Sequence, residues 1–506
     1  MPPTISKSRF ITAQHCSRRL WLETHMRDEA APSEGSAIVW GNRIGELART
    51  LRPEGRFIGD QDRFDLALAE TQTALEGAGD VVLFEPAFSA GGMAVRCDIL
   101  ERHAGRYTLT EVKSATTARE SHVQDVAYQI ATLGAAGITV ERARLQLIDN
   151  SFVYQGGGDY RGLFRIEDLT SDVLRVLPQI PERLGNYQRV LEGPEPEMAR
   201  GPHCKKPWEC GYQARCSVGE AEYPISVLPL QNAGFLEAAA AHGWRDVRDV
   251  PESYVNKPAA HRIWQATVSG QASLTEEAVA TLGSARPRMQ YLDFETWAPA
   301  IPRWRGTRPY QQLPFQWSLH TDHGAGEIQH DEFLDDTGEF PVRKAAEALI
   351  AATSCAYPIA VYTGFEHNTI GTMIVLCPDL EGALRTLQQR LVDLHPLAKE
   401  SYYHRDMQGS WSMKKLLPTI APELDYKNLG EVQEGGGAVS AYEEIIEPGT
   451  SPERKAALVQ DLKRYCRRDT EAMIAVVRRL GSARSALETS TRRQIGGAMP
   501  SSETRS

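Results

Sequence analysis

The sequence predicts an α/β protein with two domains of mixed strands and helices, joined by a small helical connector. Three observations support this prediction. The chain has 506 residues, more than a single hydrophobic core usually organises. Helical and strand-like patterns alternate over residues 1–220 and again over 288–482. Residues 221–287 instead contain short helical patterns interrupted by glycine and proline, as in a connector.

In the first domain, hydrophobic spacing separates helices from strands and predicts a β-hairpin with a tight turn at Ala104 and Gly105. The stretch from Gly193 to Pro196 then breaks the chain ahead of three cysteines. The expected elements are a helix over 40–51, the hairpin over 93–113, and helices over 122–136 and 171–191.

The last domain is expected to open with a strand over 289–296 and a second strand over 315–320. It closes with a long helix over 452–480. The tail, residues 483–506, is rich in Ser, Thr, Arg and Gly and is expected to be disordered.

The composition is that of an ordinary globular protein, and no run approaches the roughly 18 consecutive apolar residues of a membrane span. Met1 to Phe10 shows no hydrophobic segment behind basic residues, so a cytoplasmic protein without a membrane partner is expected. The net charge of -10 argues against a protein that coats nucleic acid indiscriminately. Local basic clusters leave two interpretations open, contacts with phosphates or a solvated charged face.

The predicted hairpin contains a first candidate metal site. A carboxylate at the end of an apolar strand is costly to bury unless a cation meets it. A two-residue turn would place Asp98 across from Glu111, and the period of two in a strand puts Lys113 on the same face as Glu111. Such a pocket could hold Mg²⁺ or Mn²⁺. The alternative is a surface hairpin with an ordinary ion pair.

The last domain contains a second candidate metal site. Asp293 and Glu295 alternate along the first strand, so both carboxylates reach one face. On the final helix, Asp469 interrupts an inward-facing row, and an acid on a buried face needs a partner such as a metal ion. The alternative is a core helix with a salt-bridged aspartate. The row comprises Leu458, Leu462, Tyr465, Asp469, Met473, Val476 and Leu480.

Eight cysteines in a cytoplasmic chain favour metal ligands or buried thiols over disulfides. Those among apolar residues are expected in the core: Cys97, Cys355, Cys377 and Cys466. The other four are Cys16 near the start and the evenly spaced Cys204, Cys210 and Cys216. Structural zinc sites usually include a close pair of cysteines, which this spacing lacks, and free thiols remain the alternative.

The first site resembles the PD-(D/E)xK nucleases, whose signature Asp98 and Glu111-Val112-Lys113 match. Residues 41–48 (GNRIGELA) are similar to the first-helix motif of the RecB type. The resemblance implies a restriction-endonuclease-like fold in which Asp98 and Glu111 ligate Mg²⁺ or Mn²⁺. Lys113 would then steady the attacking water or the charge that develops on the phosphate.

Two further positions extend this resemblance. Gln124 or Gln129, together with Tyr128, matches the Gln/Tyr helix motif of RecB-type nucleases. Where that family often has a metal-binding histidine, this chain has Gly45, so Glu46 is the candidate replacement ligand.

The cysteine pattern resembles the iron-sulfur version of RecB-type nucleases, in which one cysteine before the nuclease core and three behind it hold a 4Fe-4S cluster. The resemblance assigns these roles to Cys16, Cys204, Cys210 and Cys216. A cluster there would close a long loop of chain and so restrain the whole domain.

The second site resembles the DEDD exonucleases, which have an RNase H-like fold. Asp293 and Glu295 match the opening motif, and Tyr465-x-x-x-Asp469 matches the closing one. Glu366 lies where a second acid is expected, although aspartate is more usual there. The resemblance implies that the acids ligate two metal ions and that Tyr465 orients the attacking water.

Together, the motifs resemble a bacterial family that fuses an iron-sulfur RecB-type nuclease to a DEDD-type exonuclease. This implies a two-site, metal-dependent nuclease acting on DNA, with 3′-to-5′ trimming by the last domain and cleavage of single strands or flaps by the first. Repair or defence against foreign DNA is the implied setting. No motor motif is present, so unwinding would need a helicase partner.

Two alternatives remain at this stage. The first keeps the chemistry but changes the substrate to RNA, which the DEDD fold also serves. The second is not an enzyme, because Gly45 and Glu366 could mark decaying sites in a module that binds nucleic acid and recruits other proteins.

Overall fold

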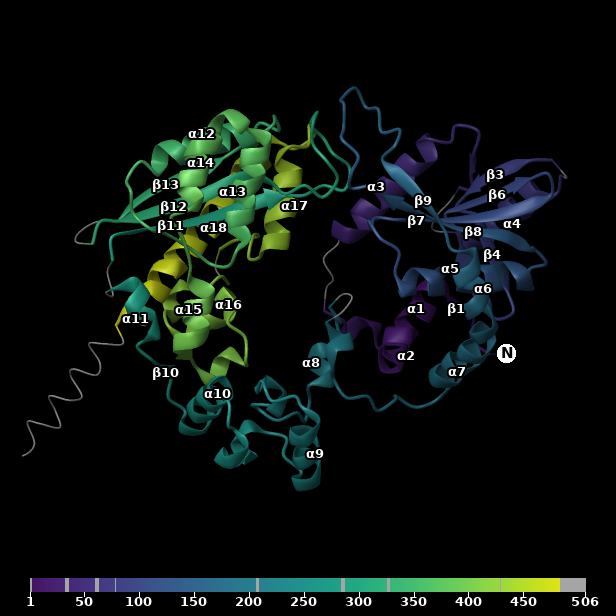
Figure 1. Cartoon of the computed structure of the whole chain (residues 1–506). Helices are drawn as coiled ribbons and strands as arrows, with labels where there is room; N and C mark the ends of the chain where they lie inside the picture. Colours follow the sequence, from purple (N-terminus) through teal and green to yellow (C-terminus); the bar gives the residue numbers. More distant parts are fainter. Residues whose placement is uncertain are drawn as a thin grey trace, which may run out of the picture. The chain divides into compact units, whose positions relative to one another are not determined.

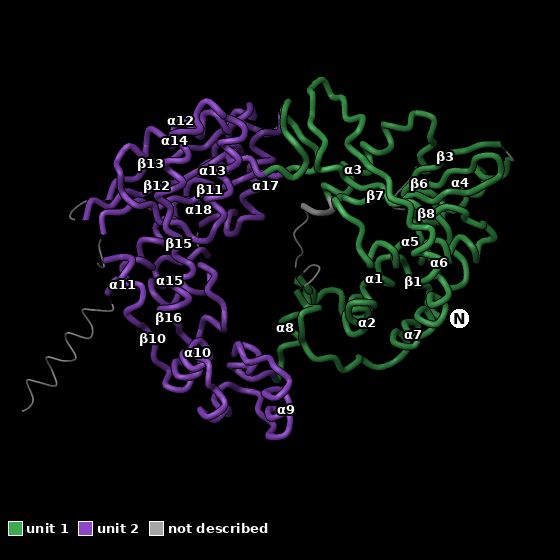
Figure 2. Tube along the Cα trace, in the orientation of Figure 1, with its two compact units in different colours: residues 1–219, 299–311 green, residues 220–298, 312–506 purple. Residues whose placement is uncertain are grey.

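The computed structural model divides the chain into two compact units, coloured separately in Figure 2. Unit 1 comprises Met1–Gly219 and Pro299–Gln311, and unit 2 comprises Glu220–Ala298 and Gln312–Ser506. The predicted disordered tail lies outside the described residues. The structure describes residues 2–31, 36–59, 63–77, 79–205, 209–283, 287–324, 328–427 and 429–482.

Unit 1 contains a six-stranded sheet in the order β2-β3-β6-β7-β8-β9. At its centre, β6 and β7 are antiparallel, whereas β7 and β8 are parallel. A smaller sheet has the order β1-β5-β4. The strands are β1 (Ile5–Ser6), β2 (Arg56–Phe57), β3 (Val81–Phe84), β4 (Ala87–Ala90), β5 (Met93–Arg96), β6 (Ile99–His103), β7 (Arg106–Lys113), β8 (Val140–Ile148) and β9 (Phe164–Asp168).

The predicted hairpin forms as β6 and β7, with His103 paired to Arg106 across a two-residue turn. Ala104 and Gly105 both have positive φ, at 48° and 79°, as the tightest hairpin turns require. The expected start of the hairpin at Met93 is wrong, because Met93–Arg96 is β5 and pairs with β1 and β4 in the other sheet.

Helices cover the sheets of unit 1, and the predicted helix over 171–191 is divided in two. Pro178 and Pro181 lie at the break, where each removes a backbone N–H donor. The helices are α1 (Lys7–His15), α2 (Ser17–His25), α3 (Ser36–Thr50), α4 (Phe64–Leu75), α5 (Glu120–Ala135), α6 (Thr170–Val176), α7 (Ile180–Glu192) and α8 (Gln213–Cys216).

Unit 2 is built on a five-stranded sheet in the order β13-β12-β11-β14-β15. Figure 1 labels β11, β12 and β13 side by side in this sheet. The first strand in sequence, β11, lies in the middle, antiparallel to β12 and parallel to β14. The strands are β11 (Met289–Trp297), β12 (Leu313–Asp322), β13 (Gln329–Leu334), β14 (Ile359–Val361) and β15 (Leu391–Asp393), with a separate pair β10 (Ser273–Leu274) and β16 (Tyr402–Tyr403).

Helices α12 and α18 cover opposite faces of this sheet. On β12, Trp317 donates to the Ala345 carbonyl of α12 at 3.0 Å, whereas the preceding Gln316 donates to the Leu462 carbonyl of α18 at 2.9 Å. The helices of unit 2 are α9 (Ala233–His242), α10 (Pro258–Ser269), α11 (Glu277–Leu282), α12 (Val342–Ala352), α13 (Phe365–Leu376), α14 (Glu381–Gln388), α15 (Leu394–Ser401), α16 (Met413–Leu416), α17 (Gly435–Ile445) and α18 (Pro452–Gly481).

The residues expected to form a connector contribute to the core of unit 2. Phe235, Ile263 and Leu282 are buried in one hydrophobic cluster with Met289 and Val476. Within the part of the chain that the structure describes, no helix combines the length and the apolar character needed to cross a bilayer.

The segment Pro299–Gln311 links β11 to β12 in sequence, yet its contacts place it in unit 1. The Tyr154 amide donates to the Thr307 carbonyl at 3.0 Å, and the Tyr160 hydroxyl donates to the Pro302 carbonyl at 3.1 Å. The loop between two strands of unit 2 is therefore held by backbone and side-chain hydrogen bonds of unit 1.

Candidate functional site

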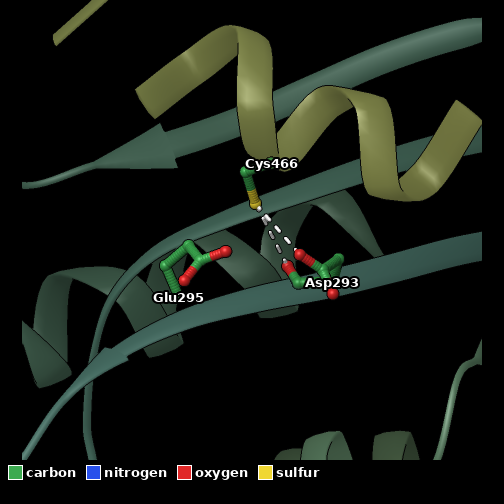
Figure 3. A group of neighbouring side chains, drawn as sticks. All are labelled: Asp293, Glu295 and Cys466. Atoms are coloured by element: carbon green, nitrogen blue, oxygen red, sulfur yellow. Dashed lines mark hydrogen bonds between the residues drawn. The ribbon is translucent and has the colours of Figure 1, made fainter. Parts of the chain in front are cut away.

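Three elements of unit 2, namely β11, α13 and α18, bring the predicted acids together. β11 presents Asp293 and Glu295 on the face that α18 covers, and α18 supplies Asp469 and Cys466. One carboxylate oxygen from each of Asp293 and Glu295 and the Sγ atom of Cys466 all lie within 4.8 Å of one another (Figure 3). The Cys466 thiol donates to Asp293 Oδ2 at 3.4 Å.

Glu366 and Asp469 complete this group, which we call the unit 2 acid cluster: Asp293, Glu295, Glu366 and Asp469. Glu366 follows β14 as the second residue of α13 and is 2% exposed. Its Oε2 atom is buried without a hydrogen-bond partner among the described residues. Asp469 Oδ1 accepts a hydrogen bond of 2.6 Å from the Tyr426 hydroxyl.

The acids of this cluster repel one another in a buried setting. Burial raises the pKa of Asp293 well above its usual range, and Asp469, Glu295 and Glu366 add to the shift. Burial and the Asp469 carboxylate also raise the pKa of Glu295 well above its usual range. Burial brings the pKa of Glu366 to about 8 and that of Asp469 to about 6.

The nearest basic groups do not neutralise the unit 2 acid cluster. Lys414 lowers the pKa values of Glu295 and Asp469 only in part, and it pairs with Glu434 at 3.5 Å. Arg468 pairs with Glu471 at 3.1 Å. Among the described ion pairs none includes an acid of this cluster, so the group can accept cations from outside the chain.

Two buried tyrosines flank Asp469. Tyr465 lies one turn before it on α18, as the closing motif requires, and Tyr426 comes from the segment before α17. Burial and then the Asp469 carboxylate raise the pKa of both phenols, so both remain proton donors. Tyr426 was missed in the sequence because it lies in an irregular segment with no periodic signal.

An open pocket of about 610 Å³ lies in unit 2, and Thr363 is among the residues that line it. Thr363, three residues before Glu366, donates its amide to Asp393 at 3.0 Å and has a strained φ of 99°. The pocket lining combines an aromatic ring, hydroxyls and a lysine: Tyr362, Thr363, His395, Lys399, Gly409, Ser410, Trp411, Ser412 and Met413.

The predicted acids of unit 1 also meet. The register that pairs Ile99 with Thr110 brings Asp98 beside Glu111, and Asp98 Oδ2 accepts from the Val112 amide at 2.6 Å. Lys113 donates to Glu111 Oε1 at 2.5 Å. Glu111 is 1% exposed. The sequence therefore located Asp98 and Glu111, and the structure adds Asp125 from α5. We call these three acids the unit 1 acid cluster.

Three residues around Glu111 and Lys113 were missed or only partly identified in the sequence. Lys7, at the start of α1, donates to Glu111 at 2.9 Å. Asp125 on α5 accepts from Lys113 at 2.7 Å. Gln129, one turn later, donates to Glu111 at 2.7 Å and to Asp125 at 3.0 Å. The four-residue spacing of Asp125 and Gln129 on a predicted helix was the available signal.

The two lysines set the electrostatics of this cluster. Burial alone would raise the pKa of Glu111, but Lys113 and Lys7 hold it well below its usual range. Burial and the Glu111 carboxylate raise the pKa of Asp98 to about 8, against the opposing effect of the lysines. One acid is thus ionised and internally paired, while its neighbour is held largely protonated.

Other predicted residues lie elsewhere. Gln124 donates to Glu120 at 2.8 Å and accepts from Arg183 at 2.7 Å, so it braces α5. The Tyr128 hydroxyl donates to the Ile5 carbonyl, and so holds β1. Glu46 is exposed on α3.

Glu85 is a nearby carboxylate that the sequence did not identify. Burial raises its pKa, Arg49 lowers it, and Glu111 raises it further, so Glu85 lies within electrostatic reach of the unit 1 acid cluster. Its Oε1 atom is 3.7 Å from an Arg49 nitrogen.

The four cysteines assigned to a cluster line one small pocket in unit 1. Cys16 begins α2, where its Sγ accepts from the Arg19 amide at 3.3 Å, and it lies 3.4 Å from the Met198 sulfur. All eight cysteines are free thiols. Residues 206–208, between two of the pocket cysteines, lie outside the described residues. The pocket cysteines are Cys16, Cys204, Cys210 and Cys216.

The cysteines expected in the core behave in two ways. Cys97, Cys377 and Cys466 are buried, whereas Cys355 is only half-buried. Cys466 is also more than a core residue, because it contacts Asp293.

Comparisons with known proteins give limited further information. A family model described as "Domain of unknown function (DUF2779)" matches residues 290–412, which span β11 to the segment before α16. No curated protein shows significant similarity to the chain. A solved structure titled "Crystal structure of SSO0001" is similar over 38% of this chain and 78% of its own, with 15% identity and a TM-score of 0.21.

Proposed function

We propose that the chain is a metal-dependent nuclease that hydrolyses phosphodiester bonds, with one active site in each unit. The observation that supports it most is the unit 2 acid cluster, in which two buried and two half-buried carboxyl groups have raised pKa values and no described ion pair. Such an arrangement is costly unless cations neutralise it. Mg²⁺ or Mn²⁺, which prefer oxygen ligands, are the proposed ions.

In unit 2, Asp293, Glu295, Glu366 and Asp469 would hold two ions, as in a DEDD exonuclease. Bound divalent ions supply an activated water and stabilise charge on the leaving 3′ oxygen. Tyr426 fixes Asp469 through its hydrogen bond, and the nearby Tyr465 is the proposed group that orients the water. A central first strand with antiparallel neighbours on one side and parallel neighbours on the other also agrees with the proposed RNase H-like fold.

In unit 1, Asp98 and Glu111 are the proposed metal ligands of a PD-(D/E)xK site. Lys113, which already contacts Glu111, would steady the attacking water or the phosphate charge. Glu85 is a better-placed candidate than the exposed Glu46 for an additional ligand.

A 4Fe-4S cluster is proposed for the cysteine pocket. All four thiols line it, and they join the start of unit 1 to its end. Around one tetrahedral zinc ion, thiolates lie about 3.8 Å apart. In a 4Fe-4S cluster, by contrast, the four thiolates bind different iron atoms and lie farther apart.

DNA, most simply a single strand, is the proposed substrate. The open pocket of unit 2 offers Trp411 for contact with a base and Lys399, Ser410 and Ser412 for a phosphate. Lys414 adds positive charge close to Glu295 and Asp469. We propose repair or defence as the setting, with a helicase as the partner that supplies single strands.

The test compares two double variants with the unaltered chain on labelled DNA and RNA of one sequence, in Mg²⁺ and in Mn²⁺. Asp293→Ala with Asp469→Ala should remove 3′-to-5′ trimming, and Glu111→Ala with Lys113→Ala should remove the remaining cleavage. Matched controls are Glu347→Ala with Asp379→Ala in unit 2 and Glu101→Ala with Arg144→Ala in unit 1, which involve exposed or half-exposed ion pairs.

If both double variants keep the activity of the unaltered chain, both site assignments are refuted. If RNA is cleaved as fast as DNA or faster, RNA would replace DNA as the proposed substrate. An absorbance band near 400 nm (roughly) in anaerobically prepared protein tests the iron-sulfur cluster, because zinc and free thiols lack it.

A further inference from the structure

Cys466 is a buried thiol placed between two acids of the unit 2 acid cluster. It is 0% exposed and lies on α18 between Tyr465 and Asp469 in sequence. Figure 3 shows its side chain directed toward Asp293. The proposed hydrolysis uses the carboxylates but gives this thiol no role. A thiol at a site of hard oxygen ligands changes which cations the site prefers, because sulfur favours softer metals.

The geometry already matches that of two ligands on one metal ion. An ion with bonds of about 2.3 Å to sulfur and about 2.0–2.2 Å to oxygen places tetrahedral ligands about 3.5 Å apart. Cys466 Sγ and Asp293 Oδ2 are 3.4 Å apart. Glu295 supplies a third ligand atom within 4.8 Å of both.

A second observation points to a ligand at the same place. Glu366 is buried, its Oε2 atom has no hydrogen-bond partner among the described residues, and its carboxylate acts electrostatically on Asp293. A buried oxygen without a partner carries a desolvation cost that a bound cation would offset.

We propose that Asp293, Glu295 and Cys466 form a binding site for a thiophilic divalent cation of the zinc class. On binding, the thiol releases its proton to solvent, and so does each carboxyl group of Asp293 and Glu295 that is protonated. The S–H···O hydrogen bond to Asp293 is then replaced by bonds from sulfur and oxygen to the metal. The site therefore binds Zn²⁺ in preference to Mg²⁺. Zn²⁺ bound there displaces the hard ions that the proposed nuclease needs, a consequence that rests on the proposed function.

The test is a calorimetric titration of the full chain with Zn²⁺ in the absence of nucleic acid. Cys466→Ser keeps the size and polarity of the side chain, and Cys377→Ser is the matched control, another buried thiol of unit 2. We expect the Zn²⁺ affinity of one site to fall on the order of a hundredfold in Cys466→Ser and to be unchanged in Cys377→Ser. The cysteine pocket of unit 1 is the same in all three proteins, so the difference isolates Cys466.

Co²⁺ provides an independent readout, because a thiolate ligand produces a charge-transfer band in the near ultraviolet. That band should be weaker in Cys466→Ser than in Cys377→Ser. If the serine variant does not fold, as judged by thermal unfolding in chelator, Cys466→Ala is measured in its place. Equal Zn²⁺ affinity and equal Co²⁺ spectra in the Cys466 and Cys377 variants would overturn the site.

The outcome is separable from that of the proposed function. Cys466-dependent Zn²⁺ binding in a chain that cuts neither DNA nor RNA would support the metal site and refute the nuclease. Mg²⁺-dependent cleavage by the unaltered chain, together with Zn²⁺ binding that is the same with and without Cys466, would support the nuclease and refute the metal site.

Discussion

The two acid clusters are similar in composition but differ in where their counter-charge comes from. In unit 1, Lys7 and Lys113 reach Glu111 at 2.9 and 2.5 Å and keep it ionised. In unit 2, no described ion pair includes the four acids, and burial with mutual repulsion raises their pKa values. Burial of carboxylates alone therefore does not distinguish the two sites, and the case for the proposed metal ions is stronger in unit 2, where no described ion pair balances the acids.

This difference predicts opposite responses to removal of an acid. The unit 1 acid cluster should lose stability, because its lysines would be left without their partner. The unit 2 acid cluster should gain stability in the absence of metal, because a repulsion is removed. The predictions below test or refine this contrast, from the largest expected effect to the smallest.

The largest effect is expected for Glu111→Ala. Removing one partner of a buried ion pair leaves the other charge uncompensated, which should lower the free energy of unfolding of unit 1 by about 3 kcal/mol. Glu101→Ala on the neighbouring strand β6 breaks only a partly exposed contact of 3.7 Å with Arg144 and should cost less than about 1 kcal/mol. Urea unfolding, followed by hydrogen exchange in β7, measures both.

Metal binding should stabilise unit 2 more than unit 1. At a free Mg²⁺ concentration of about 100 times its dissociation constant, binding adds about 2.7 kcal/mol to the folded state. Hydrogen exchange in β11 and α18 should slow accordingly, and Asp293→Asn should abolish the effect. Exchange in β6 and β7 should slow less, since the lysines there already neutralise Glu111. Equal protection of both units would contradict the contrast.

Without divalent ions, the stability of unit 2 should fall as pH rises. The pKa of Glu366 is about 8 in the folded chain and 4.5 in its ordinary state, so the folded state binds the proton more tightly. The stability that Glu366 protonation adds to unit 2 is complete below about pH 4.5 and is lost as pH rises through about 8. Between pH 5 and 8, the free energy of unfolding of unit 2 should fall by about 2 kcal/mol less in Glu366→Gln than in the unaltered chain, as measured by thermal unfolding in chelator.

Glu347→Gln, an exposed acid on α12 of the same unit, is the control for this pH dependence. It should leave the slope unchanged, and saturating Mg²⁺ should flatten the slope in the unaltered chain. A stability that rises with pH over this range would show that Glu366 is ionised and paired in the folded state.

The local parts of this arrangement could be predicted from the sequence. Asp293 and Glu295 share a face because strands repeat every two residues. The predicted row on α18 is buried at its six other positions, whereas Asp469 is half-buried. The tight turn fixed the register of Asp98 against Glu111. In each case the determining interactions lie within one strand, one helix or one hairpin.

The remaining parts depend on contacts between distant segments. Lys7 reaches Glu111 because β1 pairs with β5 and α1 packs beside α5, neither of which leaves a periodic signal. Tyr426 reaches Asp469 from an irregular segment. Cys466 was expected only as a core residue, because its contact with Asp293 depends on how α18 crosses β11.

The smallest effect concerns the substrate strand at the unit 2 acid cluster. Lys414 lowers the pKa values of Glu295 and Asp469, so its charge is felt where a phosphate would lie in the proposed site. Lys414→Ala should weaken binding of a single-stranded oligonucleotide by about threefold at moderate salt and reduce the salt dependence by about one phosphate contact. Lys415→Ala, the same change at the next residue of α16, is the control. Fluorescence anisotropy with Ca²⁺ in place of Mg²⁺ measures binding, and equal effects of the two changes would indicate diffuse attraction to α16 instead of a phosphate position beside the acids.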